Sequence, residues 1–489
     1  MKKISLEKYF VGLGKDSFIY GLGNAVLKIL ALITAPIFTR IFVPAEYGII
    51  SLIASIISFL SLLLIFGMDS AIPVSFYQYK RERKIIISSG FWFLLFWSLS
   101  LVALGNILAF RISDLVFHQF SYGVLFLIAF WTAFFTLMIN LAKAVFRLEF
   151  RPKTFALVAC LQAILTTGLM ILLVVYFKMG LTGYFAGGLL GGLISFLLSI
   201  YLIKNNLSFR ISFPRLKEMI AYGSMIVPAS IAFFVFDLSD RFFLNHYRDL
   251  TELGLYSIGI NIASLLLFFS VAIGQAWSPF VLKLYFESKK IFHQFVPRVF
   301  SYYLIFFFSL ALLLSLFGEE ILRIFATEKF YGASQVIAPL TLAMVFSASL
   351  QVTAMGISIT RKTKYFAFFS GLAAGLNILL NFLLIPRYGM VGAGWATALS
   401  YLFLTLAYFF QSQKFIYLSI DWQKITKLVL LTVGAILLLP LSWQFGFWEN
   451  LLLKFGEFGL VLVLLYLIGV IEKKELQYLK ITFKKAVKS

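Results

Sequence analysis

The sequence predicts an all-α integral membrane protein with fourteen transmembrane helices, arranged as two pseudo-symmetric six-helix bundles and a trailing helix pair. Of its 489 residues, 61% are hydrophobic and 13% are charged, and the mean hydropathy is +0.95. A soluble protein cannot bury this much apolar surface. Apolar stretches of about 20 residues, the length needed to cross a bilayer, recur along the chain. The chain also resembles itself after a shift of 209 residues.

The predicted spans follow one another with short connections. In chain order, they are residues 17–42, 48–73, 85–110, 122–146, 154–177, 182–203, 218–242, 254–279, 296–317, 334–358, 365–385, 389–411, 425–445 and 450–471. Spans one to six form the first predicted bundle, residues 17–208, and spans seven to twelve form the second, residues 209–416. Residues 417–489 contain the last two spans and a basic tail.

The N-terminal segment, residues 1–16, precedes the first span. Its lysines and its apolar residues predict an amphipathic helix on the inner membrane surface. It does not read as a cleavable signal, because a full-length apolar stretch follows it without a small-residue cleavage pattern.

The internal repeat relates the two bundles. Tyr47 corresponds to Tyr256, since 256 − 47 = 209, and the same shift aligns the pairs Gly180–Gly183 and Gly389–Gly392. Single identities are weak evidence in so apolar a chain, but one offset that holds at several helix boundaries predicts a duplication. Duplicated bundles are a common way to build a central transport site.

Basic residues gather in alternate loops. One set of loops is strongly basic and includes residues 80–84, 147–153, 204–217, 283–298, 361–364, 414–427 and the tail. The other set carries one or two basic residues each. This alternation requires an even number of spans and predicts that both termini are cytoplasmic. Each bundle then enters from the same side, so the repeat is parallel rather than inverted.

Composition also argues against several classes of function. A net charge of +21 suggests nucleic acid in a soluble protein, but here the positive-inside rule accounts for it. Cys160 is the single cysteine, so no disulfide forms within the chain. The three histidines have no metal-ligand spacing, and Gly12-Leu13-Gly14-Lys15 lacks the first glycine of a phosphate loop. No cofactor and no nucleic-acid partner is predicted.

Charged residues inside spans are the candidate functional residues. A lysine at the bilayer centre costs about 2.5–3.5 kcal/mol, so such residues usually face a cavity or a partner. Lys28 lies near the middle of the first span, one turn after Asn24. Asp237, Asp240 and Arg241 lie in the outer part of the seventh span. The spacing of Asp237 and Arg241 is equally consistent with a simple local ion pair.

Prolines and glycines mark special helix positions. Pro36 in the first span and Pro228 in the seventh span remove backbone hydrogen bonds, and they predict kinks that are candidates for gating. Gly183, Gly187 and Gly191 form a small-residue stripe on the sixth span. The stripe predicts close packing against another helix.

A longer motif spans the junction of the eleventh and twelfth predicted spans. Residues 377–397 read NILLNFLLIPRYGMVGAGWAT, and Arg361-Lys-Thr-Lys364 precedes them. Near the start, Pro36 is followed by Arg40 and Glu46-Tyr47-Gly48. These features resemble bacterial polysaccharide flippases of the multidrug/oligosaccharidyl-lipid/polysaccharide exporter superfamily. The resemblance covers nearly the whole chain.

The resemblance implies a MATE-like pair of bundles around a cavity that faces each side of the membrane in turn. It implies transport of a polyprenyl-pyrophosphate-linked oligosaccharide from the inner to the outer leaflet of the bacterial cytoplasmic membrane, for surface polysaccharide such as O-antigen. The sequence leaves open whether a sodium ion, a proton or the membrane potential drives transport, and other polysaccharide-assembly membrane proteins would be partners. Because cations replace the hydration of a pyrophosphate, Lys28 and Arg241 are its expected ligands, with Asn24, Asn377 and Asn381 as polar partners.

Two other functions remain open at this stage. A multidrug or cation antiporter would share the fold and would favour a buried acidic group, whereas the deepest charge in the first bundle is Lys28. A membrane polymerase or ligase acting on lipid-linked sugars would need a large external loop to build its site. The sequence offers none, so we do not expect an enzyme.

Overall fold

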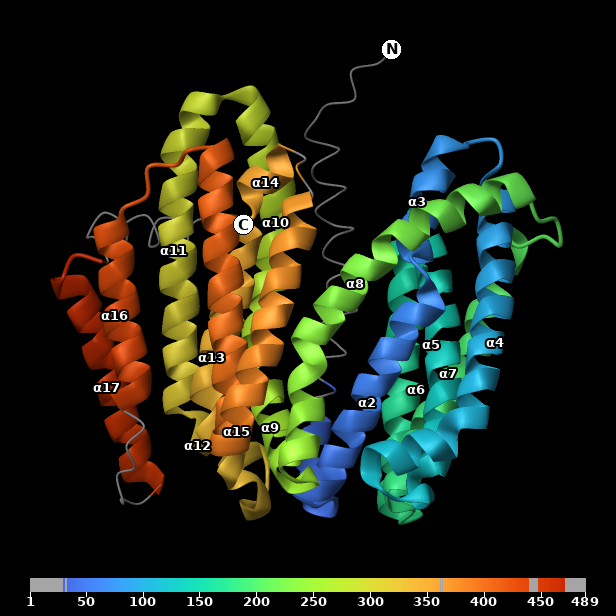
Figure 1. The fold of residues 1–489 in the computed structure, drawn as a ribbon, viewed down its shortest axis with the longest axis horizontal. Coiled ribbons are helices and arrows are strands. Elements are labelled where there is room, and N and C mark those ends of the chain that lie inside the picture. The colour runs from blue at the N-terminus through green and yellow to red at the C-terminus, as the bar shows by residue number, and fades with distance from the viewer. Residues whose placement is uncertain (1–29, 31–32, 361, 363, 439–446, 471–489) are drawn as a thin grey trace. The chain divides into compact units, whose positions relative to one another are not determined.

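The computed structural model describes the chain except residues 1–29, 31–32, 361, 363, 439–446 and 471–489. The described residues are almost entirely helical and include no strand, which confirms the predicted all-α fold (Figure 1). Contacts divide the chain into two compact units, Met1–Arg241 and Phe242–Ser489. The division falls inside helix α8. The bundle boundaries taken from the sequence repeat remain a prediction.

The first unit begins with a helical stretch at residues 33–41. The elements that follow are α2 (Pro44–Ile65), α3 (Met68–Gln78), α4 (Arg83–Phe117), η1 (Phe120–Tyr122), α5 (Gly123–Leu148), α6 (Pro152–Ile171), η2 (Leu172–Tyr176), α7 (Gly180–Ile203), η3 (Lys204–Asn206) and most of α8 (Phe213–Tyr247).

The second unit begins with the end of α8. It continues with α9 (Leu250–Ala263), α10 (Leu265–Glu287), α11 (Lys289–Leu316), α12 (Gly318–Phe325), η4 (Glu328–Ala333), α13 (Ser334–Thr353), α14 (Met355–Ile359), α15 (Lys364–Phe415), α16 (Trp422–Leu438) and α17 (Phe447–Leu467).

Ten helical stretches of the described chain are long and apolar enough to cross a membrane. The longest, α15, contains 52 residues and covers two predicted spans, 365–385 and 389–411. Gly389 has a non-helical backbone inside it, with φ 54° and ψ −135°, so the chain turns there and forms two arms. A left-handed φ favours glycine because it has no Cβ. α8 and α16 cover the seventh and part of the thirteenth predicted span.

The glycine stripe on α7 packs against α6, as the sequence predicts. A Cβ added at Gly187 would collide with the backbone of Met170, and one added at Gly191 would collide with the backbone of Thr166. The two helices approach each other at backbone distance because these positions have no side chain. Close packing of this kind replaces the hydrophobic driving force that helices lose in lipid.

A second close approach joins α8 to the break between α2 and α3. Gly67, with φ 70°, begins α3, and a Cβ there would lie 2.6 Å from the Cα of Gly223 on α8. Farther along, the rings of Phe59 and Phe234 have centroids 5.0 Å apart. The first two-thirds of α8 therefore pack within the first unit.

Candidate functional site

Two predicted site residues, Asn24 and Lys28, lie outside the described residues, as does the amphipathic segment 1–16. The other charged candidates lie on α8. Asp240 is buried, with 3% of its surface exposed, and its Oδ1 accepts a hydrogen bond of 2.8 Å from the backbone N–H of Arg241. Asp237 lies one turn earlier on the same helix.

The guanidinium of Arg241 is the most informative group of this set. Its Nε and Nη1 atoms are buried, and neither has a hydrogen-bond partner among the residues that the structure describes. Buried nitrogens of a cation that make no hydrogen bond are costly, because they have lost the water that stabilised their charge. An anion that docks against these two nitrogens would restore that stabilisation, and a planar guanidinium binds phosphate oxygens in pairs.

The two predicted asparagines belong to the first arm of α15. Asn377 and Asn381 are fully buried, and the Nδ2 of Asn381 donates a hydrogen bond of 2.9 Å to the Oδ1 of Asn377. The structure therefore brings these two together within the second unit. Arg241 belongs to the first unit.

Both predicted gating prolines lie inside helices. Pro36 belongs to the helical stretch 33–41, where its carbonyl accepts a hydrogen bond of 3.4 Å from the Thr39 hydroxyl. Pro228 lies in the middle of α8, which Figure 1 draws as a long curved ribbon. A proline inside a helix leaves one carbonyl without its usual backbone partner, which makes bending easier. Whether either proline gates transport remains a prediction.

Sequence analysis missed a polar clamp on the turn inside α15. The Glu252 carboxylate on α9 accepts a hydrogen bond of 3.0 Å from the backbone N–H of Met390. Arg248 donates to the carbonyls of Ile385 and Pro386, at 3.2 and 3.1 Å. These bonds satisfy backbone groups that the turn frees from the helix. The sequence signals the break at Pro386 and Gly389, but nothing in it relates that break to Arg248 and Glu252, which are about 140 residues away.

A second missed cluster joins the turn before α4 to the start of α8. Arg215 donates to Glu82 through Nε at 2.9 Å, and its guanidinium lies 3.7 Å from the ring centroid of Tyr79. The Tyr79 hydroxyl donates to Glu218 at 2.8 Å. The hydrogen bond from Arg215 lowers the pKa of Glu82, and the hydrogen bond to Glu218 raises the pKa of Tyr79. This cluster lies on the side of the first unit that carries the basic loops.

A buried ion pair connects the last helix to the second unit. Lys454 on α17 donates to both carboxylate oxygens of Glu320 on α12, at 2.7 and 2.8 Å. The two side chains are 15% and 6% exposed. Such a pair depends on both partners, because either charge alone would be left buried. It fixes the trailing helix against the body of the unit.

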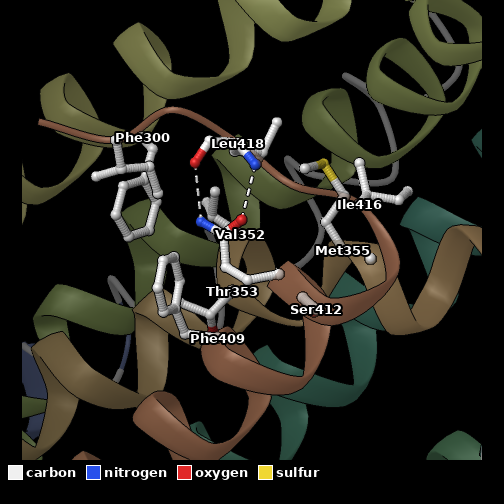
Figure 2. Close-up of a pocket in the computed structure, with 11 residues that line it drawn as sticks. Phe300, Val352, Thr353, Met355, Phe409, Ser412, Ile416 and Leu418 are labelled. Atoms are coloured by element: carbon white, nitrogen blue, oxygen red, sulfur yellow. Dashed lines mark hydrogen bonds between the residues drawn. The ribbon is translucent and has the colours of Figure 1, made fainter.

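A small cavity lies where α15 ends, and Figure 2 shows the residues that line it. The side-chain amide of Gln413 exchanges two hydrogen bonds with the backbone of Leu418, at 3.1 and 2.7 Å. The volume is about 20 Å³, the space of roughly one water molecule. The arrangement therefore fixes the connection from α15 to α16 and is too small for a substrate.

The chain is similar in sequence to membrane proteins of other organisms. The chain is 22% identical over 267 residues to an uncharacterized membrane protein of Methanocaldococcus jannaschii, covering 52% of this chain and 50% of that protein. It is 24% identical over 240 residues to a probable low-salt glycan biosynthesis flippase of Haloferax volcanii, covering 45% of this chain and 48% of that protein. The chain thus spans about half the length of these relatives.

Solved structures show the same fold. The lipid II flippase MurJ in an inward closed conformation superposes with a TM-score of 0.71 and 17% identity, over 92% of this chain and 99% of that one. An inward-facing multidrug resistance MATE family transporter superposes with a TM-score of 0.66 and 14% identity, over 82% of this chain and 94% of that one. The chain therefore has the MATE-like fold that the sequence predicts.

One protein family matches more than half of the chain. It is the family described as polysaccharide biosynthesis protein, and its sequence pattern aligns with residues 37–335. Together with the flippase relative and the fold, this match confirms the resemblance to polysaccharide flippases. The chain is a multi-pass membrane protein and belongs to the polysaccharide biosynthesis protein family.

Proposed function

We propose that this protein flips a polyprenyl-pyrophosphate-linked oligosaccharide from the inner to the outer leaflet of the cytoplasmic membrane by alternating access. The product would enter surface polysaccharide assembly. Both termini would be cytoplasmic, as the loop charges predict. The chain would act as a transporter, without a catalytic step of its own.

One observation carries this proposal, the burial of the Nε and Nη1 atoms of Arg241. Two of its nitrogens have no hydrogen-bond partner in the described chain, and the residue lies near the end of a helix in a predicted membrane span. A pyrophosphate that leaves water needs fixed cations in exchange for its hydration. Arg241 would bind it together with Lys28, and Asn24, Asn377 and Asn381 would contact neutral parts of the substrate.

The family and the fold support the same function. The matching family concerns polysaccharide biosynthesis, the Haloferax volcanii relative is named as a probable glycan flippase, and the fold resembles that of a lipid II flippase. The family and the relative support a glycan as substrate, and the fold supports a transporter; a lipid-linked form of that glycan is part of the proposal. Asp237 and Asp240 would couple transport to a sodium ion or a proton, and bending at Pro36 and Pro228 would open and close the path.

A cation antiporter is the second candidate, and the burial of Asp240 is the observation that favours it. An acidic group inside the membrane can bind an organic cation as readily as a coupling ion. In that function Asp240 would be the substrate ligand, and Arg241 would only balance its charge. The two candidates therefore differ in which neighbour on α8 is indispensable.

The test is transport by the full chain in proteoliposomes. A lipid-linked oligosaccharide is placed in the inner leaflet, and its arrival outside is followed by lectin binding. Arg241→Gln should lower the flipping rate by at least about tenfold, since a charge-assisted hydrogen bond contributes roughly 1.5–3 kcal/mol. Arg323→Gln is the matched control, because Arg323 carries the same charge on a side chain that is 39% exposed.

The outcomes separate the two candidates. Flipping that survives Arg241→Gln at the control rate would remove Arg241 from the substrate site. Uptake of an organic cation that depends on Asp240, without any flipping of the lipid-linked glycan, would favour the antiporter.

A further inference from the structure

A cavity of about 520 Å³ opens in the first unit, on the side where the basic loops gather. Four segments that are distant in sequence form it: the end of α3, the start of α4, the turn after α5, and η3. Its lining includes Phe76, Tyr77, Arg83, Lys84, Glu149 and Phe150. A cavity of this size is in the range of small-molecule and cofactor sites.

The cavity has an excess of positive charge. It contains three cationic side chains and one carboxylate, Glu149. Arg151 pairs with Glu149 at 3.5 Å, and the Asn206 amide donates to the same carboxylate. Arg83 and Lys84 have no ion-pair partner in the part of the chain that the structure describes. Two cations therefore face the cavity with their charge uncompensated.

Aromatic side chains form the other half of the lining. The guanidinium of Arg83 lies 4.6 Å from the ring centroid of Phe76, which orients the cation. Phe150 is 67% exposed and has φ 55°, the left-handed conformation of the turn that ends α5, where the backbone N–H of Arg151 donates to the carbonyl of Phe146. This turn directs the Phe150 ring away from the helix. Tyr77 is also exposed, at 46%.

We propose that this cavity binds the phosphate of an anionic glycerophospholipid from the adjacent leaflet. Arg83 and Lys84 would hold the phosphate oxygens, because basic pockets between transmembrane helices at the membrane surface suit such headgroups. Phe150 and Tyr77 would contact the glycerol and the upper acyl chains, at the depth where aromatic residues concentrate. This site goes beyond the proposed flippase function and does not require it.

The positive-inside rule alone does not explain this arrangement. That rule asks only for basic residues in the loop and is indifferent to where each one points. Lys80 and Arg81 lie just before α4 and are exposed, as Arg83 and Lys84 at the start of α4 are, yet neither Lys80 nor Arg81 lines the cavity. The pair Lys80 and Arg81 therefore has the same charge as the pair Arg83 and Lys84 but lies outside the cavity. It is a matched control.

The experiment measures lipid binding to the full chain in detergent by native mass spectrometry. Phosphatidylglycerol is titrated against the unmodified protein, the double variant Arg83→Gln/Lys84→Gln, and the control Lys80→Gln/Arg81→Gln. We expect binding to weaken by at least about tenfold in the first double variant, since two charge-assisted bonds are lost, and by less than about twofold in the control. Zwitterionic phosphatidylcholine should bind more weakly than phosphatidylglycerol.

A second variant tests the role of the strained aromatic residue. Phe150→Gly should raise the unfolding temperature, because glycine adopts a positive φ without strain. The same variant should weaken phosphatidylglycerol binding. A protein that is more stable but binds lipid less well cannot be explained by misfolding.

Three results would overturn the proposal. Equal losses in the two double variants would show a diffuse surface charge instead of a site. Inorganic pyrophosphate that binds as tightly as phosphatidylglycerol and displaces it would identify a free-anion site. Unchanged lipid binding in Phe150→Gly would remove the aromatic part of the site.

Discussion

Gly180 and Gly389 have the same positive φ of 54°, and they are 209 residues apart, since 389 − 180 = 209. Each glycine lies at the junction of two predicted spans in its own unit. The spacing found in the sequence is therefore repeated in the backbone. The surroundings differ, because no atom lies within 4 Å of a Cβ at Gly180, whereas the Glu252 carboxylate contacts that position at Gly389.

Replacing each of these glycines by alanine should have unequal effects. Gly180→Ala should cost about 1–2 kcal/mol, the strain of a left-handed alanine. Gly389→Ala should cost more, because its Cβ would also collide with Glu252 and disturb the hydrogen bond to Met390. Thermal unfolding in detergent, followed by tryptophan fluorescence, measures both variants.

The excess cost at Gly389 has its own control. In a Glu252→Ala background the collision is absent, so the cost of Gly389→Ala should fall to the strain of its own backbone, with φ 54° and ψ −135°. An unchanged cost in that background would show that the collision with Glu252 contributes nothing.

Lys28 should be required for transport. Lys28→Ala and Lys28→Glu should abolish surface polysaccharide in cells that depend on this protein, because each removes a cation from the predicted site. Lys28→Arg should retain activity if charge is the property that matters. Immunoblots of the membrane fraction check that protein levels are unchanged. Normal export by the alanine and glutamate variants would contradict this role.

The buried pair of Glu320 and Lys454 should stabilise the second unit far more than its exposed neighbour does. Glu320→Gln should cost about 3–5 kcal/mol, because it leaves Lys454 buried without a counter-charge. Glu319→Gln, one residue earlier, breaks an exposed pair with Arg323 and should cost about 0–1 kcal/mol. Thermal unfolding compares the two variants. Similar unfolding temperatures would mean that the Lys454 ammonium has found another partner.

The cluster around Arg215 should make stability depend on pH. The folded pKa of Glu82 is lowered from 4.5, so its contribution is complete above pH 4.5 and is lost as the pH falls through the folded pKa. The pKa of Tyr79 is raised from 10.0, so its contribution is complete below pH 10 and is lost as the pH rises further. Unfolding temperatures measured from acidic to alkaline pH check both the loss at low pH and the loss at high pH.

Glu82→Gln isolates the contribution of Glu82 to the pH dependence of stability in the acidic range. At neutral pH the variant should be less stable than the unmodified protein, and the two should converge as the pH falls below the folded pKa of Glu82. A constant difference across the acidic range would show that Glu82 does not titrate with folding.

The fold class and the positions of most helices could be predicted from the sequence, because a bilayer imposes a length and a polarity on every crossing segment. The break between predicted spans 365–385 and 389–411 coincides with Gly389, where the chain turns. The glycine stripe on α7 also predicted its packing, because only small residues allow backbones to approach so closely. Local patterns are sufficient for these features.

Polar contacts between distant segments could not be predicted in this way. Glu252 with Met390 and Lys454 with Glu320 are each well over 100 residues apart, and no periodicity relates them. Sequence analysis placed Arg241 in a span, but only the structure shows that its Nε and Nη1 are buried without a partner in the described chain. Burial depends on which helices surround a side chain, and hydropathy does not record this.

The sequence by itself determined the membrane environment, the helical spans and the 209-residue repeat, because each follows from local apolarity and from the spacing of residues along one chain. Only the tertiary structure decided which cations line a cavity. Arg83 and Lys84 at the start of α4 line it, while Lys80 and Arg81 just before that helix do not. The charge of a side chain follows from the identity of the residue. The surroundings of Arg83 and Lys84 depend on how the four segments that form the cavity pack together.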